Sequence, residues 1–122
     1  MVDNLDCVFC KIIKGEIPSK KEYEDEKVIV IHDLHPRAPV HLLVIPKNHR
    51  PENIVYLEDG DKELLMSMFM VANGLVKKLG LDQKGFVYRF NGGGYQHINH
   101  LHLWIVGGSK MEPMTENPRD FE

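Results

Sequence analysis

Seven histidines stand out in a chain of 122 residues that contains a single tryptophan. Four of them lie within residues 32–49, three lie within 97–102, and none lies between the two groups. Imidazole titrates near neutral pH, ligates metal ions and transfers protons, so it suits several kinds of site chemistry. Two clusters separated by a long helical segment predict one site that is built from two distant parts of the chain. The alternative is a set of solvated loop histidines.

The second cluster runs into a strand-like segment, residues 100–106 (HLHLWIV). Alternation along a strand sends His100, His102 and Trp104 to one face and the intervening apolar residues to the other. Neighbours on one face are about 6–7 Å apart, so the two imidazoles can share one bound group. The alternative is a half-exposed edge strand with no chemistry.

A glycine run, Asn91-Gly-Gly-Gly-Tyr-Gln96, lies just ahead of this strand. Consecutive glycines let backbone N–H groups approach an anion closely, although glycines also merely turn a chain. Next to a histidine pair, the run favours a phosphate beside an imidazole. Imidazole can then act as a general base or as a nucleophile at phosphorus.

The remaining pattern predicts an α+β domain with an antiparallel sheet of about five strands. Apolar spacing indicates a short helix within residues 4–14, followed by Gly15 as a stop. A long helix runs from Asp61, which can cap it, to about Leu79, with Gly80 after it. Strands are expected at 21–24, 27–33, 41–46, 85–91 and 100–106. Residues 1–108 form one domain, and 109–122 form a C-terminal tail without periodicity.

Composition excludes several function classes. The net charge of −3 argues against both sequence-specific and general binding of nucleic acid. No apolar run approaches the roughly 20 residues of a membrane span. The N-terminus has neither a basic region nor a long apolar region, so we expect no signal peptide and a cytoplasmic location. Cys7 and Cys10 are expected to be reduced or metal-bound rather than paired as a disulfide.

Three segments together resemble the histidine triad (HIT) family. His100-Leu-His102-Leu-Trp104-Ile-Val-Gly-Gly resembles its signature, His-x-His-x-His followed by apolar residues and glycines. The segment 32-HDLHPRAPVHLLVIPKNH-49 is similar to its second hallmark. The opening 7-CVFCKIIKGEIP-18 resembles the Hint-like and bacterial branch. The resemblance covers residues 7–108 in order.

The resemblance implies a HIT-like fold, a homodimer, and cleavage at the α-phosphorus of a purine nucleotide. His102 matches the middle triad histidine, the nucleophile that forms a nucleotidyl-imidazole. His100 and His41 match the histidines that orient and polarise the site. His32 and His35 match no functional position, and surface positions suit them.

The resemblance also implies a nucleotide-binding set. Asp33 matches the acid that binds the ribose, and a carboxylate can accept from both vicinal hydroxyls. The alternative is an ordinary turn acid. Asn91 and Gln96 match positions near the phosphate. The apolar base pocket corresponds to Val8, Ile12, Ile31 and Leu34.

Two positions depart from the family pattern. Trp104 stands at the third triad position, where an indole N–H can touch a phosphate oxygen but cannot transfer a proton. His97 stands where the Hint-like branch usually has a small hydroxyl residue near the leaving group. We hypothesise that His97 protonates the leaving group, the alternative being a position at the rim.

The resemblance to zinc-bearing bacterial relatives implies a Cys₂His₂ site of structural type, formed by Cys7, Cys10, His49 and His100. Residues 7 and 10 share one face of the expected helix. Two alternatives stay open: buried thiols acting as small hydrophobes, and a redox dithiol. A zinc ligand cannot also be a base, so zinc at His100 would leave that residue the role of aiming His102.

The expected function is therefore a HIT-type nucleoside phosphoramidase that acts through His102 on purine nucleoside 5′-phosphoramidates or related esters. A dinucleoside polyphosphate hydrolase would use the same nucleophile. A weakly active nucleotide-binding scaffold dimer is the alternative from another class, because Trp104 interrupts the triad.

Overall fold

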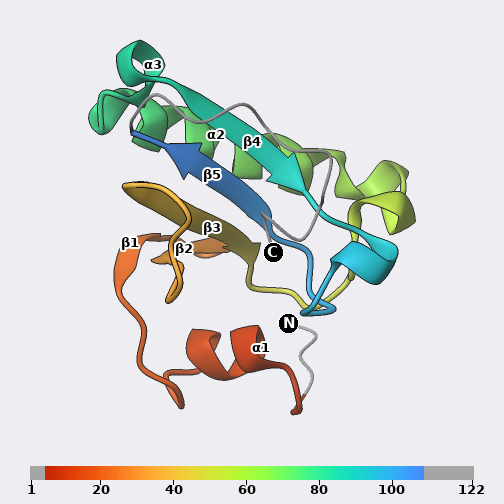
Figure 1. Cartoon of the computed structure of the whole chain (residues 1–122). Helices are drawn as coiled ribbons and strands as arrows, with labels where there is room; N and C mark the ends of the chain where they lie inside the picture. The colour runs from red at the N-terminus through yellow and green to blue at the C-terminus, as the bar shows by residue number, and fades with distance from the viewer. Residues whose placement is uncertain (1–4, 109–122) are drawn as a thin grey trace.

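The computed structural model describes residues 5–108, and its centre is a five-stranded antiparallel sheet (Figure 1). The strands lie in the order β1-β2-β3-β5-β4. Their bounds are Lys21–Glu24 (β1), Val28–His32 (β2), Val40–Pro46 (β3), Phe86–Phe90 (β4) and Leu103–Gly107 (β5). The α+β class, the strand count and the two main helices predicted from the sequence are confirmed.

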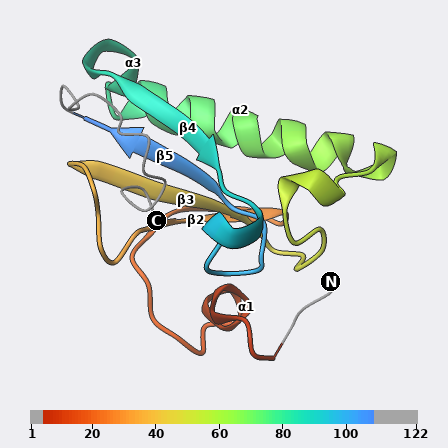
Figure 2. The ribbon, with the colours of Figure 1, turned by 45° about the vertical axis from the view of Figure 1, so that its right-hand side comes forward.

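The long helix α2 (Lys62–Lys78) covers one face of the sheet (Figure 2). Its buried residues lie three or four apart, the spacing of one helix face: Met68, Ala72, Leu75 and Val76. They pack against alternate residues of the central strands, such as Leu103 and Ile105 of β5. This contact forms the main core on one face of the sheet.

The short helix α1 (Val8–Ile13) lies on the opposite side of the sheet (Figure 2). Phe9 and Cys10 are its buried residues. They form a second apolar cluster with the other alternate set of sheet residues, which includes Trp104 and Val106. The predicted division of residues 100–106 between two faces is therefore confirmed.

Two predicted details of the ends differ. The last strand starts at Leu103 rather than at His100, so His100 and His102 lie in the segment that leads into it. Asp61 makes no side-chain cap for α2. Its carboxylate instead accepts the Glu58 N–H at 2.8 Å, which closes the preceding 3₁₀ turn Asp59–Asp61.

Four short helical pieces were not predicted. They are the 3₁₀ turns Ile54–Tyr56, Asp59–Asp61 and Gly93–Tyr95, and the helix α3 (Leu81–Lys84). The predicted tail 109–122 lies outside the described residues. Among the described helices, none has the length and apolar character needed to cross a membrane.

Candidate active site and metal centre

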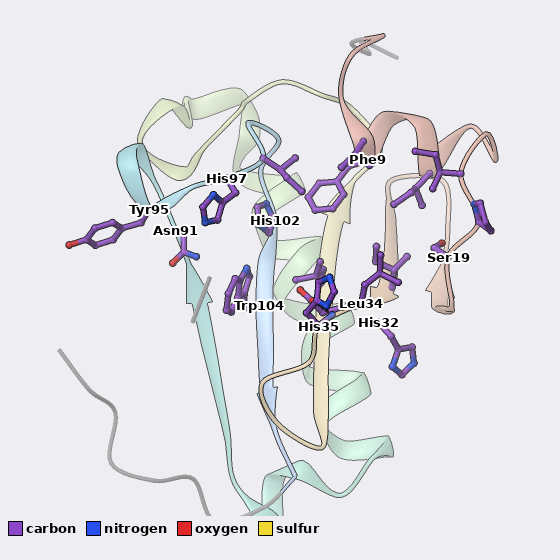
Figure 3. Close-up of a pocket in the computed structure, with 18 residues that line it drawn as sticks. Phe9, Ser19, His32, Leu34, His35, Asn91, Tyr95, His97, His102 and Trp104 are labelled. Carbon is purple, nitrogen blue, oxygen red and sulfur yellow. Dashed lines mark hydrogen bonds between the residues drawn. The ribbon is translucent and has the colours of Figure 1, made fainter. Parts of the chain in front are cut away.

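A cavity of about 250 Å³ opens between α1 and the sheet face that α1 covers (Figure 3). Its apolar wall consists of Val8, Phe9, Ile12, Ile17, Pro18, Ile31, Leu34, Leu43 and Ile98. Its polar and aromatic groups are Ser19, His32, Asp33, His35, Asn91, Tyr95, His97, His102 and Trp104. A largely apolar pocket with a few convergent polar groups is typical of a small-molecule site.

His102 presents one defined ring nitrogen to this cavity. Its Nδ1 donates a hydrogen bond to the carbonyl oxygen of His100 at 2.7 Å. A carbonyl only accepts, so the proton is on Nδ1 and Nε2 carries the lone pair. Burial lowers the pKa of His102 below its usual value. The ring is therefore neutral at neutral pH, the state required of a nucleophile.

His41 is held in the opposite tautomer. Its Nδ1 accepts the backbone N–H of Arg37 at 3.3 Å, so Nε2 carries the hydrogen. Nε2 lies 3.6 Å from Asp33 Oδ2, which is an ion-pair distance but too long for a hydrogen bond. Burial lowers the pKa of His41, although the nearby Asp33 carboxylate opposes that shift. The side chain thus offers a donor next to the carboxylate.

Trp104 lies against His41 and presents an unsatisfied donor. Their ring centroids are 4.6 Å apart with the planes tilted by 51°. Trp104 is buried, and its Nε1 has no hydrogen-bond partner among residues 5–108. A buried donor without a partner costs about 1–3 kcal/mol. The position therefore suits a ligand that brings an acceptor atom.

Asn91 and Asp33 both line the cavity, and they directly follow β4 and β2 in the chain. Figure 3 shows Asn91 beside Trp104 and His102, on the side of β4. The Asn91 amide oxygen accepts the Nε–H of Arg89 at 2.7 Å. Asp33 Oδ1 accepts the backbone N–H of His35 at 2.8 Å. Both polar side chains are therefore fixed by neighbours within their own segment.

Gln96 is not among the residues that line the cavity. Its side-chain Nε2 donates to the Glu52 carbonyl oxygen at 2.7 Å. The glycine run ahead of it folds into a 3₁₀ turn, and the N–H groups of Tyr95 and Gln96 bond back to Gly92 and Gly93. Two of the amides that could have formed a phosphate nest are thus used within the turn, and the nucleotide-binding role of Gln96 stays a prediction.

Next to the cavity, a second set of residues forms a compact metal-type cluster. Cys7, Cys10, His49 and His100 are all buried, and one ligand atom from each lies within 4.8 Å of all the others. Cys7 Sγ and Cys10 Sγ lie 3.4 and 3.6 Å from His100 Nδ1. His49 Nδ1 lies 3.4 Å from Cys10 Sγ and 3.2 Å from His100 Nδ1. Tetrahedral zinc needs ligand atoms about 3.3–3.8 Å apart, so the donor set fits zinc.

One imidazole of this cluster also has a suitable outer partner. His100 Nε2 donates to the Pro46 carbonyl oxygen at 2.7 Å, which leaves the Nδ1 lone pair facing the cluster. His49 Nε2 lies 3.5 Å from Glu52 Oε1. Burial lowers the pKa of His100 to about 4, so the ring is neutral at neutral pH. The Pro46 carbonyl is a partner of the kind that orients a histidine ligand, whereas His49 Nε2 makes no hydrogen bond among residues 5–108. The four residues form a Cys₂His₂ zinc site.

Sequence reasoning missed several residues around the cavity. His32 and His35 were given no role, but both line it; His35 is exposed, in agreement with the expected surface position. His32 is only half-buried and lies 3.2 Å from Glu22 Oε1. Phe9 packs edge-on against His102, with centroids 5.0 Å apart. The adjacency of His32 to Asp33 was a usable signal, whereas the Phe9 contact depends on how α1 docks.

Comparisons with known proteins agree with this geometry. The family described as "Scavenger mRNA decapping enzyme C-term binding" matches residues 6–119, which includes most of the predicted tail. A protein from Zea mays named "14 kDa zinc-binding protein" is 38% identical over 113 residues, covering 90% of this chain and 88% of the relative.

Solved structures agree as well. A histidine triad protein from Clostridium difficile has a TM-score of 0.87 at 39% identity, covering 93% of this chain and 100% of that one. A HIT family hydrolase from Clostridium thermocellum has a TM-score of 0.85 at 42% identity, covering 92% of this chain and 98% of that one. With its paired site histidines and its Cys₂His₂ cluster, the chain belongs to the histidine triad family.

Proposed function

We propose that the protein hydrolyses or transfers nucleotides by cleaving at the α-phosphorus of purine nucleoside 5′-phosphoramidates or related esters. The observation that carries this proposal is the hydrogen bond from His102 Nδ1 to the His100 carbonyl. It leaves a neutral imidazole with its Nε2 lone pair at a cavity that is also lined by the Asp33 carboxylate and by Trp104, whose Nε1 donor has no partner among residues 5–108. Membership of a family with solved hydrolase structures supports hydrolytic chemistry.

The cavity is lined by apolar and by polar residues, which suit the base and the polar parts of a nucleotide respectively. The apolar residues Val8, Ile12, Ile31 and Leu34 would enclose the base. Asp33 keeps Oδ2 available to the ribose hydroxyls while Oδ1 is bound to His35. Asn91 and Trp104 would donate to phosphate oxygens near His102. In this assignment Asp33, Asn91 and Trp104 each meet a part of the ligand that they can satisfy.

The proposed reaction proceeds in two displacements. His102 Nε2 attacks the α-phosphorus, a P–N bond to the imidazole forms, and the bond to the amine leaving group breaks as the amine takes up a proton. Water then attacks the same phosphorus and gives its proton to the group that had protonated the amine. The P–N bond breaks, the nucleoside monophosphate is released and neutral His102 is restored. The His100 carbonyl, which holds Nδ1–H at 2.7 Å, stabilises the positive charge on the nucleotidyl-imidazole.

His97 is the proposed proton donor to the leaving group. It lines the catalytic cavity and also a second hollow that extends toward Glu52 and Asn99. This position would bring its ring to the side from which the amine leaves. A His97→Ala variant should lose turnover on poor leaving groups most strongly, and unchanged turnover would exclude the role.

His41 and His100 have supporting roles in the proposal. The His41 Nε2–H lies beside Asp33 and the Trp104 ring, where it would polarise the site. Both ring nitrogens of His100 are already engaged, one toward the metal cluster and one by Pro46. His100 therefore acts by holding its carbonyl against His102 rather than as a base.

Zinc would be held by the four cluster residues. When bound, it supplies a structural cross-link between α1, the residues after β3 and the segment before β5. This cross-link fixes His100, whose carbonyl sets the tautomer of His102.

A nucleotide-binding dimer with little turnover is the second candidate, and Trp104 is the observation that favours it. An indole at the third triad position cannot accept or release a proton as imidazole does. The two candidates are separated by assaying an adenosine phosphoramidate and a diadenosine polyphosphate with the wild type and His102→Ala. Turnover that is lost in the variant supports the enzyme, and the preferred substrate identifies the chemistry. Nucleotide binding without turnover in either protein supports the binding role.

We also propose a homodimer. The outer strand β4 is an edge of the sheet. Phe86 on this strand is 41% exposed, and Met66 and Met70, one turn apart on α2, are each 60% exposed. An unpaired strand edge next to exposed apolar side chains favours self-association through this side of the molecule.

A further inference from the structure

Arg89 lies on the catalytic face of the sheet, although no motif in the sequence marked it. In the antiparallel pairing of β4 with β5, Arg89 is directly opposite Trp104. Directly paired residues project to the same face. Its neighbours Tyr88 and Phe90 contact the core beneath α2 instead. Arg89 is thus a permanent cation beside the residue that replaces the third triad histidine.

The contact between Arg89 and Asn91 fixes the orientation of an amide at the cavity. Arg89 Nε lies 2.7 Å from Asn91 Oδ1. The Nε–H of arginine can only donate, so the oxygen of the amide must face Arg89. The amide NH₂ of Asn91 is consequently directed away from the guanidinium. Since Asn91 is buried and lines the cavity, its NH₂ group is the part available to a ligand.

The guanidinium of Arg89 also contacts the Trp104 indole. Its Cζ lies 5.8 Å from the centre of that ring, within the range of a cation–π contact. The imidazole of His41 also contacts the indole. Arg89 therefore contacts Asn91 and Trp104, the two residues proposed to donate to phosphate oxygens.

We infer that Arg89 is a positioning residue for the phosphate of the bound nucleotide, acting through the hydrogen bond from its Nε–H to the Asn91 amide oxygen. This inference rests on the proposed nucleotide site. The orienting hydrogen bond predicts that the Nε donor matters more than the charge. It also predicts that the effect is limited to ligands that carry a phosphate.

Two substitutions separate the donor from the charge. Arg89→Gln places an N–H donor the same number of bonds from Cα as arginine Nε, but it removes the charge. Arg89→Lys keeps the charge, but it has a methylene at the Nε position and loses that donor. Arg89→Met removes both. Tyr88→Phe is the matched control, because Tyr88 is the adjacent β4 residue on the opposite face, where its hydroxyl bonds Asn73.

The experiment measures the affinity of each protein for adenosine monophosphate and for adenosine by isothermal titration calorimetry. We expect Arg89→Met and Arg89→Lys to weaken binding of the monophosphate about tenfold, the loss of one hydrogen bond to a charged group. Arg89→Gln should stay close to the wild type, and adenosine affinity should be equal in all five proteins. A merely structural role would weaken both ligands together.

Three outcomes overturn the inference. Equal monophosphate affinity in all variants excludes a positioning role, and loss in Arg89→Gln with retention in Arg89→Lys assigns the effect to charge alone. If the wild type itself binds no monophosphate, the nucleotide site fails and the inference fails with it. If Arg89→Met does not fold, the double variant Arg89→Lys/Asn91→Ala is compared with Asn91→Ala alone. The inference predicts that the two bind adenosine monophosphate equally well. A further tenfold loss of monophosphate affinity in the double variant would show that Arg89 does not act through Asn91.

Discussion

At the scale of single residues, three site imidazoles are each held in one tautomer by a backbone group. His102 Nδ1 and His100 Nε2 donate to the carbonyl oxygens of His100 and Pro46. His41 Nδ1 accepts the N–H of Arg37. Backbone groups cannot change their donor or acceptor character, so these contacts assign a lone pair to His102 Nε2 and a hydrogen to His41 Nε2. The roles proposed for these three histidines are based on that assignment.

Trp104 gives a prediction at this scale. Trp104→Phe keeps an aromatic ring against His41 but removes the Nε1 donor, which has no partner among the described residues. We expect the variant to bind adenosine monophosphate about tenfold more weakly, as for the loss of one hydrogen bond to a charged group. Binding of adenosine should be unchanged. Calorimetric titration of both ligands measures the effect, and equal monophosphate affinity would remove Trp104 from the phosphate site.

The candidate site could be predicted only in part from the sequence. His102, His41, Asp33, Trp104 and the base-pocket residues were predicted because they lie within motifs of fixed spacing. Arg89 was missed because its proximity to Trp104 depends on the register of β4 against β5. Register is set by the packing of whole strands, and it is not visible in either segment alone.

At the scale of elements, periodicity predicted the strands and helices well and their ends less well. The alternation of side chains between two faces in residues 100–106 predicted β5, but the hydrogen-bonded strand begins only at Leu103. Just before it, the side chains of His100 and His102 are engaged by the metal cluster and by the His100 carbonyl. α1 begins at Val8 because Cys7 acts as its N-cap, with Sγ accepting the Cys10 N–H at 3.4 Å. These ends depend on side-chain contacts that periodicity does not encode.

The close approach of β4 and β5 gives a prediction for element stability. A Cβ at Gly107 would overlap the Gly85 carbonyl oxygen and lie 2.9 Å from Phe86 Cα. Because both neighbours are backbone atoms, we expect Gly107→Ala to lower the free energy of unfolding by about 2 kcal/mol. Gly74→Ala within α2 meets nothing within 4 Å and should raise it by about 0.5–1 kcal/mol. Urea denaturation measures both, and a Gly107→Ala variant as stable as the wild type would contradict the packing.

The metal cluster gives a second prediction for the elements, because it joins α1 to the segment before β5. Protein purified without chelator should hold one zinc per chain, and Cys10→Ser should lose the metal and melt at a lower temperature. His35→Ala is the matched control, since His35 is a histidine outside the cluster. Elemental analysis and thermal melting measure these effects. Only a trace of zinc in the wild type would exclude the site.

At the scale of the whole molecule, the sheet separates the main apolar core from the candidate site. The face beneath α2 holds the main apolar core, and the face beneath α1 holds the cavity and the metal cluster. Substitutions on the face beneath α1 can therefore change the candidate site while the main core stays intact. The edge strand β4 contributes to both the site and the core, because Arg89 faces the site while Tyr88 and Phe90 contact the core.

The proposed homodimer is also a property of the whole molecule. We expect light scattering coupled to gel filtration to give twice the mass of the chain. Met70→Glu would place a charge among the exposed apolar side chains of α2 and should shift the protein toward the monomer. Lys62→Glu, at the exposed start of the same helix, is the control. A wild type that stays monomeric at high concentration would contradict the proposal.

The measurement that tests the account most directly is mass spectrometry of the protein during its first turnover of an adenosine phosphoramidate. The reaction is stopped in alkaline denaturant, since bonds between phosphorus and imidazole nitrogen are labile to acid. The account predicts that the chain gains the mass of one adenylyl group, that fragmentation assigns it to His102, and that the gain disappears in His102→Ala. Turnover without any adduct, or with the adduct on another residue, would contradict the central role of His102.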